Sequence, residues 1–295
     1  MRSSYTRREL LQAIGMAAAL PRITHAASTV ETRKAVFQDI PVHYESYGDG
    51  PEALVFIHGW TCDLTFWRGQ EPIYTRRRSL LIDLPGHGES GKPHVAYPME
   101  FFAKSVDAVM RDAGVERATL IGHSLGGPII YAYLRLFQER AKSMALVDVD
   151  VRKGSAGPIN REEQRQRMAR RASYMRGPAG EKDFARTVES CFTKLTPEPV
   201  KEEVRAKMFA TPQYVRVASL TSPSSLPPPG RDEAFRLPAI AIQAASPATE
   251  LSYKAMKNIF PNLDLEIWNG SGHFLMMENP TRFNETLERF LQKTN

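Results

Sequence analysis

The stretch Gly122-His123-Ser124-Leu125-Gly126 has the pattern G-x-S-x-G. It lies between an apolar, β-rich run (118–121) and a helical stretch that begins near Gly127. A serine on so sharp a strand-to-helix turn exposes its hydroxyl, and glycines at both flanks leave room for the tight backbone. The N-terminus of the helix adds free N–H groups and a positive dipole, which favour developing negative charge. This context predicts that Ser124 is a nucleophile.

Strands alternate with helices on both sides of this stretch. The chain opens with a predicted hairpin, from 35–40 and 42–47. Further strands are predicted at 53–57, 79–84, 144–149, 238–242 and 263–268, and helices at 99–113, 128–139, 251–260 and 280–292. Short continuous apolar runs are typical of strands buried on both faces. The alternation predicts an α/β fold in which helices flank a mostly parallel central sheet.

The alternation of strands and helices is interrupted between residues 152 and 236. Three helical stretches (162–176, 181–195 and 198–209) are followed by a Pro/Ser-rich connector at 221–230 that is unsuited to regular structure. We expect residues 152–236 to form a helical cap and connector over the active site. The core of the domain would then consist of residues 27–151 and 237–295.

The first 26 residues have the features of an export signal. Thr6-Arg7-Arg8-Glu9-Leu10-Leu11 resembles the twin-arginine consensus, and a short apolar run (14–20) precedes Thr24-His25-Ala26. Small residues thus occupy the two positions that a signal peptidase inspects. The sequence predicts a periplasmic or secreted protein. An uncleaved amphipathic helix is the alternative.

Composition restricts the class of protein. The 295 residues are 42% hydrophobic and 24% charged, as in ordinary globular proteins, and no run approaches the roughly 20 apolar residues of a membrane span. Half of the net charge of +6 comes from four arginines and one glutamate in residues 1–26. We therefore predict neither nucleic-acid binding nor stable membrane insertion. Nothing has the Cys/His spacing of a metal site, no cofactor is predicted, and Cys62 and Cys191 are expected to be thiols.

Four landmarks resemble the α/β-hydrolase fold family over about residues 35–293. They are His58-Gly59-Trp60, the segment from Asp83 to Ser90 (DLPGHGES), the serine turn at Ser124, and Gly270-Ser271-Gly272-His273-Phe274 followed by Glu278-Asn279-Pro280. They occur in the family's order and at suitable intervals. The resemblance implies that His273 is the base that takes the proton of Ser124. It also implies an oxyanion hole made by the main-chain N–H groups of Trp60 and Leu125. We expect His58 and His87 to brace their loops, and His123 to flank the nucleophile without acting as base.

The acidic member of a triad is where the chain departs from the family. Most relatives carry the acid in the loop that here reads Gln243-Ala244-Ala245-Ser246-Pro247-Ala248-Thr249, which has no carboxylate before Glu250. A minority takes the acid from the end of the strand after the nucleophile helix, which here ends Leu146-Val147-Asp148-Val149-Asp150. We therefore predict Asp148, with Asp150 as the alternate and Glu250 third.

The resulting hypothesis is a serine hydrolase that cleaves a small-to-medium carboxylic ester through an acyl-enzyme. A lactonase, thioesterase, C–C bond hydrolase or perhydrolase would use the same triad. A non-catalytic binding protein with the same fold is the alternative from another class. Three aromatic residues near the oxyanion loop (Trp60, Phe66 and Trp67) either line an acyl pocket or belong to the core. Nine Arg or Lys residues between 152 and 182 either steer acidic substrates or form a solvated helix face.

Overall fold

The computed structural model describes residues 30–149, 151, 161–227, 230 and 232–294. The signal peptide expected at residues 1–26 and the alternate acid Asp150 lie outside the described residues, so both stay predictions. Within the described residues, no helix is long and apolar enough to cross a membrane.

Eight strands form one sheet in the order β1-β2-β4-β3-β5-β6-β7-β8. Their bounds are β1 (Glu31–Phe37), β2 (Ile40–Tyr47), β3 (Glu52–Ile57), β4 (Ser79–Ile82), β5 (Arg117–His123), β6 (Ala141–Val147), β7 (Ala239–Ala244) and β8 (Leu263–Trp268). The strands from β3 to β8 pair in parallel, and β2 pairs antiparallel with both β1 and β4. The prediction of a mostly parallel sheet flanked by helices is confirmed.

The opening hairpin turns two residues earlier than predicted. Gln38 and Asp39 both have positive φ (49° and 62°), as in the two-residue turns that match strand twist. Phe37 therefore pairs with Ile40, which belongs to the second strand rather than to the first.

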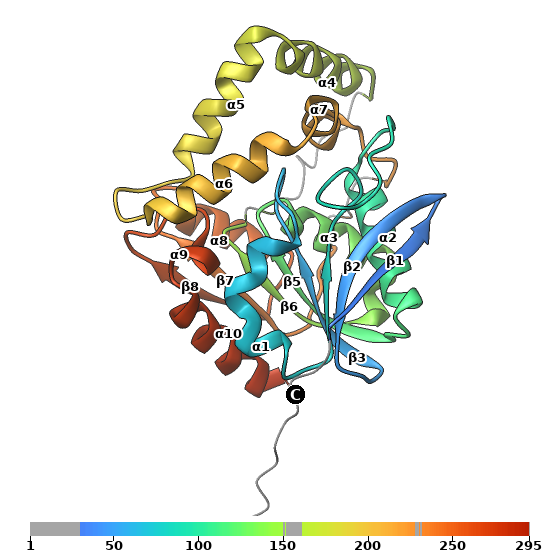
Figure 1. Ribbon diagram of the computed structural model, residues 1–295, viewed down its shortest axis with the longest axis vertical. Helices are drawn as coiled ribbons and strands as arrows, with labels where there is room; N and C mark the ends of the chain where they lie inside the picture. Colours follow the sequence, from blue (N-terminus) through green and yellow to red (C-terminus); the bar gives the residue numbers. More distant parts are fainter. Residues whose placement is uncertain (1–29, 150, 152–160, 228–229, 231, 295) are drawn as a thin grey trace, which may run out of the picture.

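Helices cover both faces of the sheet (Figure 1). Their bounds are η1 (Leu64–Gln70), α1 (Glu71–Tyr74), α2 (Met99–Asp112), α3 (Gly126–Phe137), η2 (Gln138–Arg140), α8 (Thr249–Lys257), α9 (Leu275–Glu278) and α10 (Pro280–Thr294). Helices α2, α3 and α8 bury apolar side chains in one core cluster, and η1, α1, α9 and α10 do so in a second. Successive residues of β3 alternate between the two clusters, as Val55 and Phe56 do, because side chains of a strand point to opposite faces.

In the part of the chain that the structure describes, four helices lie between β6 and β7. They are α4 (Arg161–Arg176), α5 (Pro178–Ser190), α6 (Glu198–Ala210) and α7 (Gln213–Thr221), and we call residues 161–221 the cap. Figure 1 shows the cap above the edge of the sheet where the parallel strands end. Helix α7 and the short helices η1, α1 and α9 were not predicted from the sequence.

Hydrogen bonds and an ion pair join the cap to loops of the core. The Thr211 hydroxyl donates to the carbonyl of Thr61 at 3.2 Å, and Lys207 pairs with Asp63 at 2.9 Å. The main-chain N–H of His273 donates to the carbonyl of Cys191 at 2.7 Å. The cap is thus attached to the loop after β3 and to the loop after β8.

Candidate active site

The serine turn joins β5 directly to α3. Ser124 has a φ of 51°, in the left-handed region, and its main-chain N–H donates to the carbonyl of Val147 at 3.0 Å. A Cβ atom on Gly126 would lie 2.6 Å from the carbonyl oxygen of Ile57, and one on Gly122 would lie 2.6 Å from the Ile130 side chain. Glycine is therefore required on both sides of Ser124. A left-handed serine costs roughly 1–3 kcal/mol, and such strain is concentrated at functional sites.

His273 and Asp148 form a hydrogen-bonded pair. The Nδ1 atom of His273 lies 2.5 Å from Oδ2 of Asp148, although 125 residues separate them in sequence. The His273 side chain is 27% exposed and that of Asp148 is 19% exposed, so solvent and small molecules can approach the pair. Of the predicted acids within the described residues, Asp148 is the one that the structure brings against His273.

Asp148 is held firmly at the end of β6. Its φ is 46°, and its main-chain N–H donates to the carbonyl of Ile242 at 2.8 Å. Its Oδ1 atom accepts a hydrogen bond from the main-chain N–H of Ala244 at 2.9 Å. The loop after β7, which has no carboxylate before Glu250, thus contributes a hydrogen-bond donor to the acid on the neighbouring strand.

Glu250, the third candidate acid, does not contact this pair. Glu250 lies in α8 with its side chain 77% exposed, and it pairs with Lys254 at 2.8 Å. Asp150 lies outside the described residues.

His123 links the serine turn to the histidine loop. Its Nε2–H donates to the main-chain carbonyl of His273 at 2.9 Å, and the two rings are 4.6 Å apart between centroids. Burial, and then the nearby charge of His273, hold the pKa of His123 well below its ordinary value. His123 is therefore neutral at pH 7, and Nε2 is the protonated nitrogen, since it is the one that faces a carbonyl.

Two main-chain donors lie beside the serine turn. Leu125 precedes the first residue of α3, and Trp60 is the third residue after β3. Among the hydrogen bonds of the described residues, none has the main-chain N–H of Trp60 or of Leu125 as its donor. The indole N–H of Trp60 donates to the carbonyl of Arg216 in α7 at 3.1 Å, which fixes the loop against the cap.

Residues 52–215 match the alpha/beta hydrolase fold family. The chain belongs to this family. An uncharacterised protein of Mycobacterium tuberculosis is 26% identical over 281 residues, which cover 84% of this chain and 77% of that protein. A pimeloyl-[acyl-carrier protein] methyl ester esterase of Vibrio campbellii is 39% identical over 87 residues, 29% of this chain and 32% of that protein.

Solved structures show the same fold at low sequence identity. An esterase from Thermogutta terrifontis has a TM-score of 0.74 and 21% identity, with 90% of this chain and 99% of that chain covered. The enol-lactonase from Burkholderia xenovorans has a TM-score of 0.71 and 22% identity, with 88% and 99% covered.

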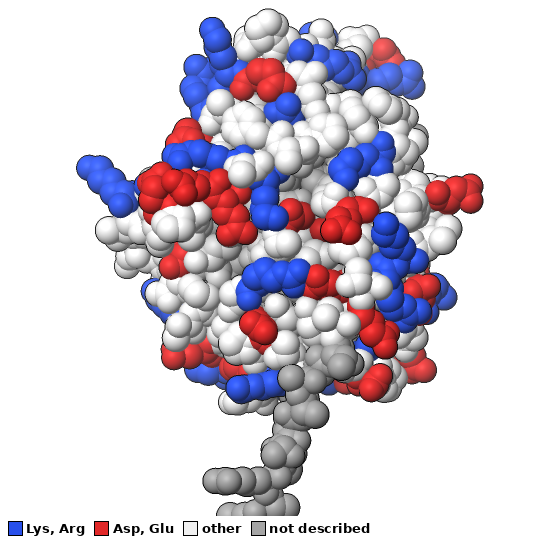
Figure 2. Space-filling view, viewed as in Figure 1, with Lys and Arg blue, Asp and Glu red and all other residues white. Residues whose placement is uncertain are grey.

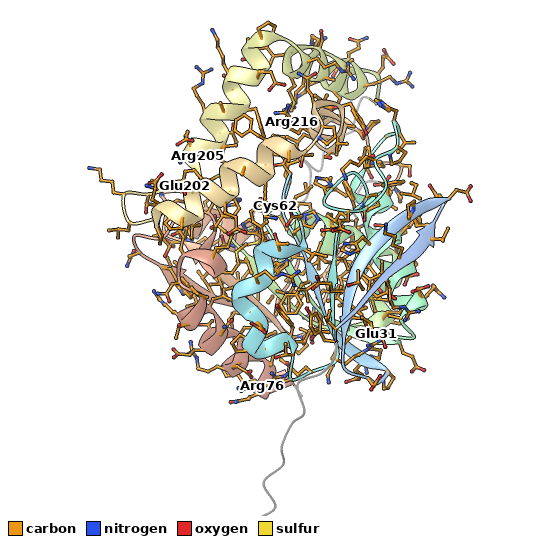
Figure 3. All side chains as sticks on the ribbon, in the orientation of Figure 1. Glu31, Cys62, Arg76, Glu202, Arg205 and Arg216 are labelled. Carbon is orange, nitrogen blue, oxygen red and sulfur yellow. The ribbon has the colours of Figure 1, made fainter. Side chains whose placement is uncertain are left out.

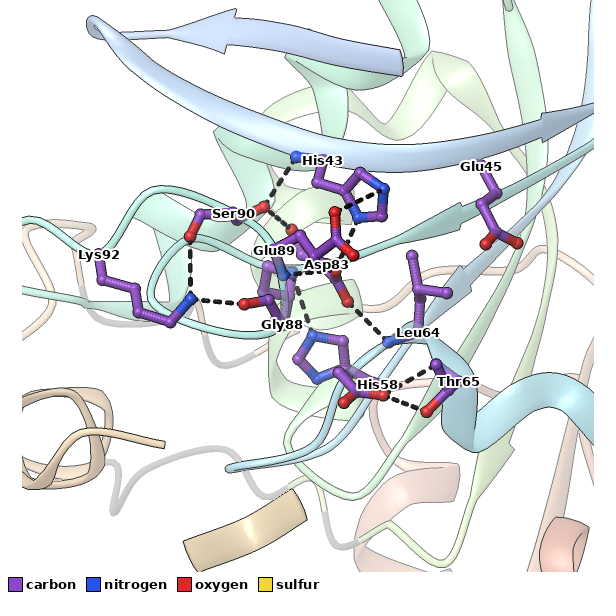
Figure 4. Close-up of polar contacts among 12 residues, drawn as sticks. His43, Glu45, His58, Leu64, Thr65, Asp83, Gly88, Glu89, Ser90 and Lys92 are labelled. Atoms are coloured by element: carbon purple, nitrogen blue, oxygen red, sulfur yellow. Dashed lines mark hydrogen bonds and ion pairs between the residues drawn. The ribbon is translucent and has the colours of Figure 1, made fainter. Parts of the chain in front are cut away.

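A second family landmark, the segment from Asp83 to Ser90, braces the loops beside the site (Figure 4). The carboxylate of Asp83 accepts hydrogen bonds from the main-chain N–H groups of Leu64 and Glu89, each at 2.8 Å, and its Oδ2 lies 2.7 Å from Nδ1 of His43. Asp83 therefore ties the segment that follows β4 to both η1 and β2.

Two further histidines lie in the same interior. His58 donates through Nδ1 to the carbonyl of Gly59 at 2.8 Å and accepts through Nε2 from the N–H of Leu84 at 3.0 Å. Both of its ring nitrogens are thus bonded to backbone. His87 is buried beside it, and burial lowers the pKa of His87 to about 3. These positions agree with the predicted bracing role.

The cap supplies aromatic and basic side chains next to Trp60. The ring of Phe184 in α5 packs edge-on against Trp60 with centroids 5.4 Å apart, and the guanidinium of Arg216 lies 4.2 Å from the centre of the Phe184 ring. Arg216 also pairs with Glu181 at 3.0 Å (Figure 3). Sequence reasoning missed Phe184 and Arg216, because nothing local marks them. By contrast, Phe66 and Trp67 are buried in the core rather than in a pocket wall.

Neither a metal nor a disulfide is part of the described site. In the described part of the chain, no group of three or more His, Cys, Asp or Glu side chains could hold a metal ion. Cys62 and Cys191 are free thiols, as predicted.

Proposed function

We propose that this chain is a serine hydrolase that cleaves carboxylic esters of small to medium size through an acyl-enzyme intermediate. The observation that carries the proposal is the 2.5 Å contact between His273 and Asp148 beside a strained serine turn. A histidine whose Nδ1–H is held by a carboxylate presents an unprotonated Nε2, which is the form that a general base requires.

In the proposed reaction, the Ser124 hydroxyl attacks the carbonyl carbon of the ester while Nε2 of His273 takes its proton. The tetrahedral oxyanion accepts hydrogen bonds from the main-chain N–H groups of Trp60 and Leu125. The intermediate then collapses, and His273 returns the proton to the departing alcohol. Water attacks the acyl-enzyme in the same way, with its proton passing through His273 back to Ser124 as the carboxylic acid leaves.

Each group has a physical task in this scheme. Asp148 keeps His273 in the required tautomer and stabilises the imidazolium that forms during each proton transfer. The scheme requires the two main-chain donors to be in place before charge develops, and the loss of one such donor typically lowers the rate by roughly 100- to 1,000-fold. A histidine with an apolar neighbour at Nδ1 would instead have favoured the binding-protein alternative.

The preference for a modest ester rests on the cap. Phe184 and Arg216 of the cap form a wall together with Trp60 of the loop after β3, whose main-chain N–H is one of the proposed oxyanion donors. Such a wall favours a substrate that fits beneath the cap. The basic helix α4 is a solvated face rather than part of this wall, because its Arg165 side chain is 78% exposed. Figure 2 shows Lys and Arg side chains in blue on the surface at the top of the molecule, where the cap lies.

The decisive experiment is intact-mass analysis after exposure of protein lacking residues 1–26 to a small organophosphonate. We expect a single adduct on the wild type and none on Ser124→Ala. A panel of esters, thioesters and lactones then defines the class of substrate. If folded wild-type protein acquires no adduct and turns over none of these compounds, the hydrolase proposal is wrong.

A further inference from the structure

The loop that carries His273 is bonded to the cap as well as to the core. The segment between α5 and α6 (residues 191–197), which we call the α5–α6 turn, contacts this loop directly. The carbonyl of Cys191 accepts the hydrogen bond from the N–H of His273 at 2.7 Å, and the Thr193 hydroxyl donates to the carbonyl of Gly270 at 2.9 Å. The main chain on both sides of Ser271 is thereby attached to the cap.

Glu278 makes a third connection through its carboxylate. Oε2 accepts a hydrogen bond from the N–H of Gly272 at 2.7 Å, and Oε1 accepts one from the hydroxyl of Thr196 at 3.2 Å. Thr196 is 3% exposed, and its hydroxyl also accepts from the N–H of Thr193 at 2.9 Å. A single carboxylate at the end of α9 thus bridges the histidine loop and the α5–α6 turn.

Gly272 lies too close to these groups to carry a side chain. A Cβ atom there would lie 2.5 Å from the carbonyl oxygen of Cys191 and 2.5 Å from Oε1 of Glu278. The glycine before His273 is therefore required by the close approach of the cap.

Side chains of the two flanking helices hold the α5–α6 turn in place. Arg205 in α6 donates to both carboxylate oxygens of Glu189, near the end of α5, and to Glu198 at the start of α6 (Figure 3). Its guanidinium also lies 5.3 Å from the centre of the Phe192 ring. The turn is thus a built part of the cap.

We propose that the α5–α6 turn positions His273, and that Thr196 and Glu278 are positioning residues for the base. The proposal rests on the proposed function of His273. Its consequence is that the base is in place only while the cap is seated on the core. A substrate that binds while the cap is seated is therefore turned over faster. A displacement of the base by only about 1 Å can lower the rate by up to roughly 100-fold.

The test removes one hydroxyl without changing the shape of its residue. Thr196→Val eliminates the hydrogen bond to Glu278 and the one from the N–H of Thr193, whereas Thr196→Ser retains both. We expect Thr196→Val to lower kcat for a small ester about tenfold, with KM within about twofold of wild type. We expect Thr196→Ser to have a kcat within about twofold of wild type. The matched control is Thr187→Val, on the exposed side of α5, which should change neither constant.

A second pair of variants addresses the other end of the bridge. Glu278→Ala removes both hydrogen bonds and should lower kcat at least as much as Thr196→Val. Glu278→Gln should restore most of the activity, because its amide oxygen still accepts from Gly272 and its amide N–H can donate to Thr196. Equal losses in Glu278→Ala and Glu278→Gln would contradict the bridging role.

Amide hydrogen exchange provides a readout that does not depend on catalysis. The N–H groups of Gly272 and His273 should exchange faster in Thr196→Val than in Thr187→Val, with thermal unfolding similar in both. Wild-type kcat and wild-type exchange in Thr196→Val would overturn the inference. If the wild type itself shows no turnover that depends on Ser124, the proposed function fails, whereas the exchange rates still decide whether the cap holds the loop.

Discussion

Two histidine–aspartate pairs lie along the same edge of the sheet, His273–Asp148 and His43–Asp83. Their hydrogen bonds are similar, at 2.5 Å and 2.7 Å between Nδ1 and the carboxylate. Their surroundings differ: the side chains of the first pair are 27% and 19% exposed, and those of the second are 6% and 3% exposed.

The two carboxylates also differ in their hydrogen-bond partners. Asp83 accepts hydrogen bonds from two main-chain N–H groups in addition to the one from His43, and it therefore joins three segments of chain. Asp148 accepts one main-chain N–H, from Ala244, and directs its other oxygen at His273. A histidine–aspartate pair is thus not sufficient to mark an active site. What distinguishes His273–Asp148 is partial exposure, the neighbouring serine turn and the contact with the cap.

The comparison predicts that Asp148→Asn abolishes most activity and leaves the fold intact. The asparagine oxygen can still accept from Ala244, but its NH2 group would face Nδ1 and favour the wrong histidine tautomer. We expect kcat to fall by about 10⁴-fold, the effect typical of this substitution in a serine triad. Ester turnover and thermal unfolding measure the two effects. Near-normal turnover would remove Asp148 from the mechanism and make Asp150 the candidate. Glu250→Gln, on an exposed helix, is the matched control and should be active.

For Asp83→Asn we expect the opposite result, a loss of stability with most of the activity kept. An amide in place of the carboxylate leaves one of the N–H groups of Leu64 and Glu89 facing another donor in the interior. We expect a loss of about 2 to 4 kcal/mol in the free energy of unfolding. The kcat of the folded protein should fall less than tenfold, because Asp83 follows β4, which is two strands away from the β5 strand that carries Ser124. Chemical denaturation and kinetics below the unfolding transition measure these quantities. A loss of activity as large as that of Asp148→Asn at unchanged stability would show that the division between the two pairs is wrong.

Much of this arrangement could be predicted from the sequence, because it depends on local patterns. The parallel sheet follows from apolar runs such as 53–57, and the serine turn follows from a motif that needs a strand before it and a helix after it. Asp148 could be selected from its position at the end of β6. The main-chain N–H of Ala244, which donates to Asp148, could not be predicted, because the direction of a backbone group depends on the tertiary structure.

The elements that were missed have weak local signals. Helix α7 is nine residues long, and Val215, Val217 and Thr221 are β-branched residues with low helix propensity. It is stabilised by packing against α4 and by the hydrogen bond from Trp60 to Arg216. The contact between Cys191 and His273 joins residues 82 positions apart in a cap and a core that no periodicity relates. Local pattern therefore identifies the reacting groups, whereas the parts that hold them in place require the three-dimensional structure.

The smallest expected effect is a pH dependence of the stability that the His43–Asp83 pair provides. The hydrogen bond to Asp83, opposed in part by burial, raises the pKa of His43 above its ordinary value of 6.5, and Glu89 lies 3.8 Å from its Nε2 atom. Because folding raises this pKa, the folded state binds the proton more tightly than the unfolded chain. The added stability is therefore complete below pH 6.5 and is lost as the pH rises through the folded value.

We accordingly expect the difference in unfolding free energy between wild type and His43→Gln to be larger at pH 6 than at pH 9, by about 1 kcal/mol, the scale of a charge-assisted hydrogen bond less its neutral counterpart. Urea denaturation at the two pH values measures this difference. Both pH values lie above the range in which Asp83 takes up a proton: burial alone would raise the pKa of that carboxyl, but the hydrogen bonds from His43 and from main-chain N–H groups outweigh burial and lower it. A difference that is the same at both pH values would mean that His43 stabilises β2 as a neutral ring. The charge of a histidine–aspartate pair would then matter to this protein only at Asp148, where the proposed reaction needs it.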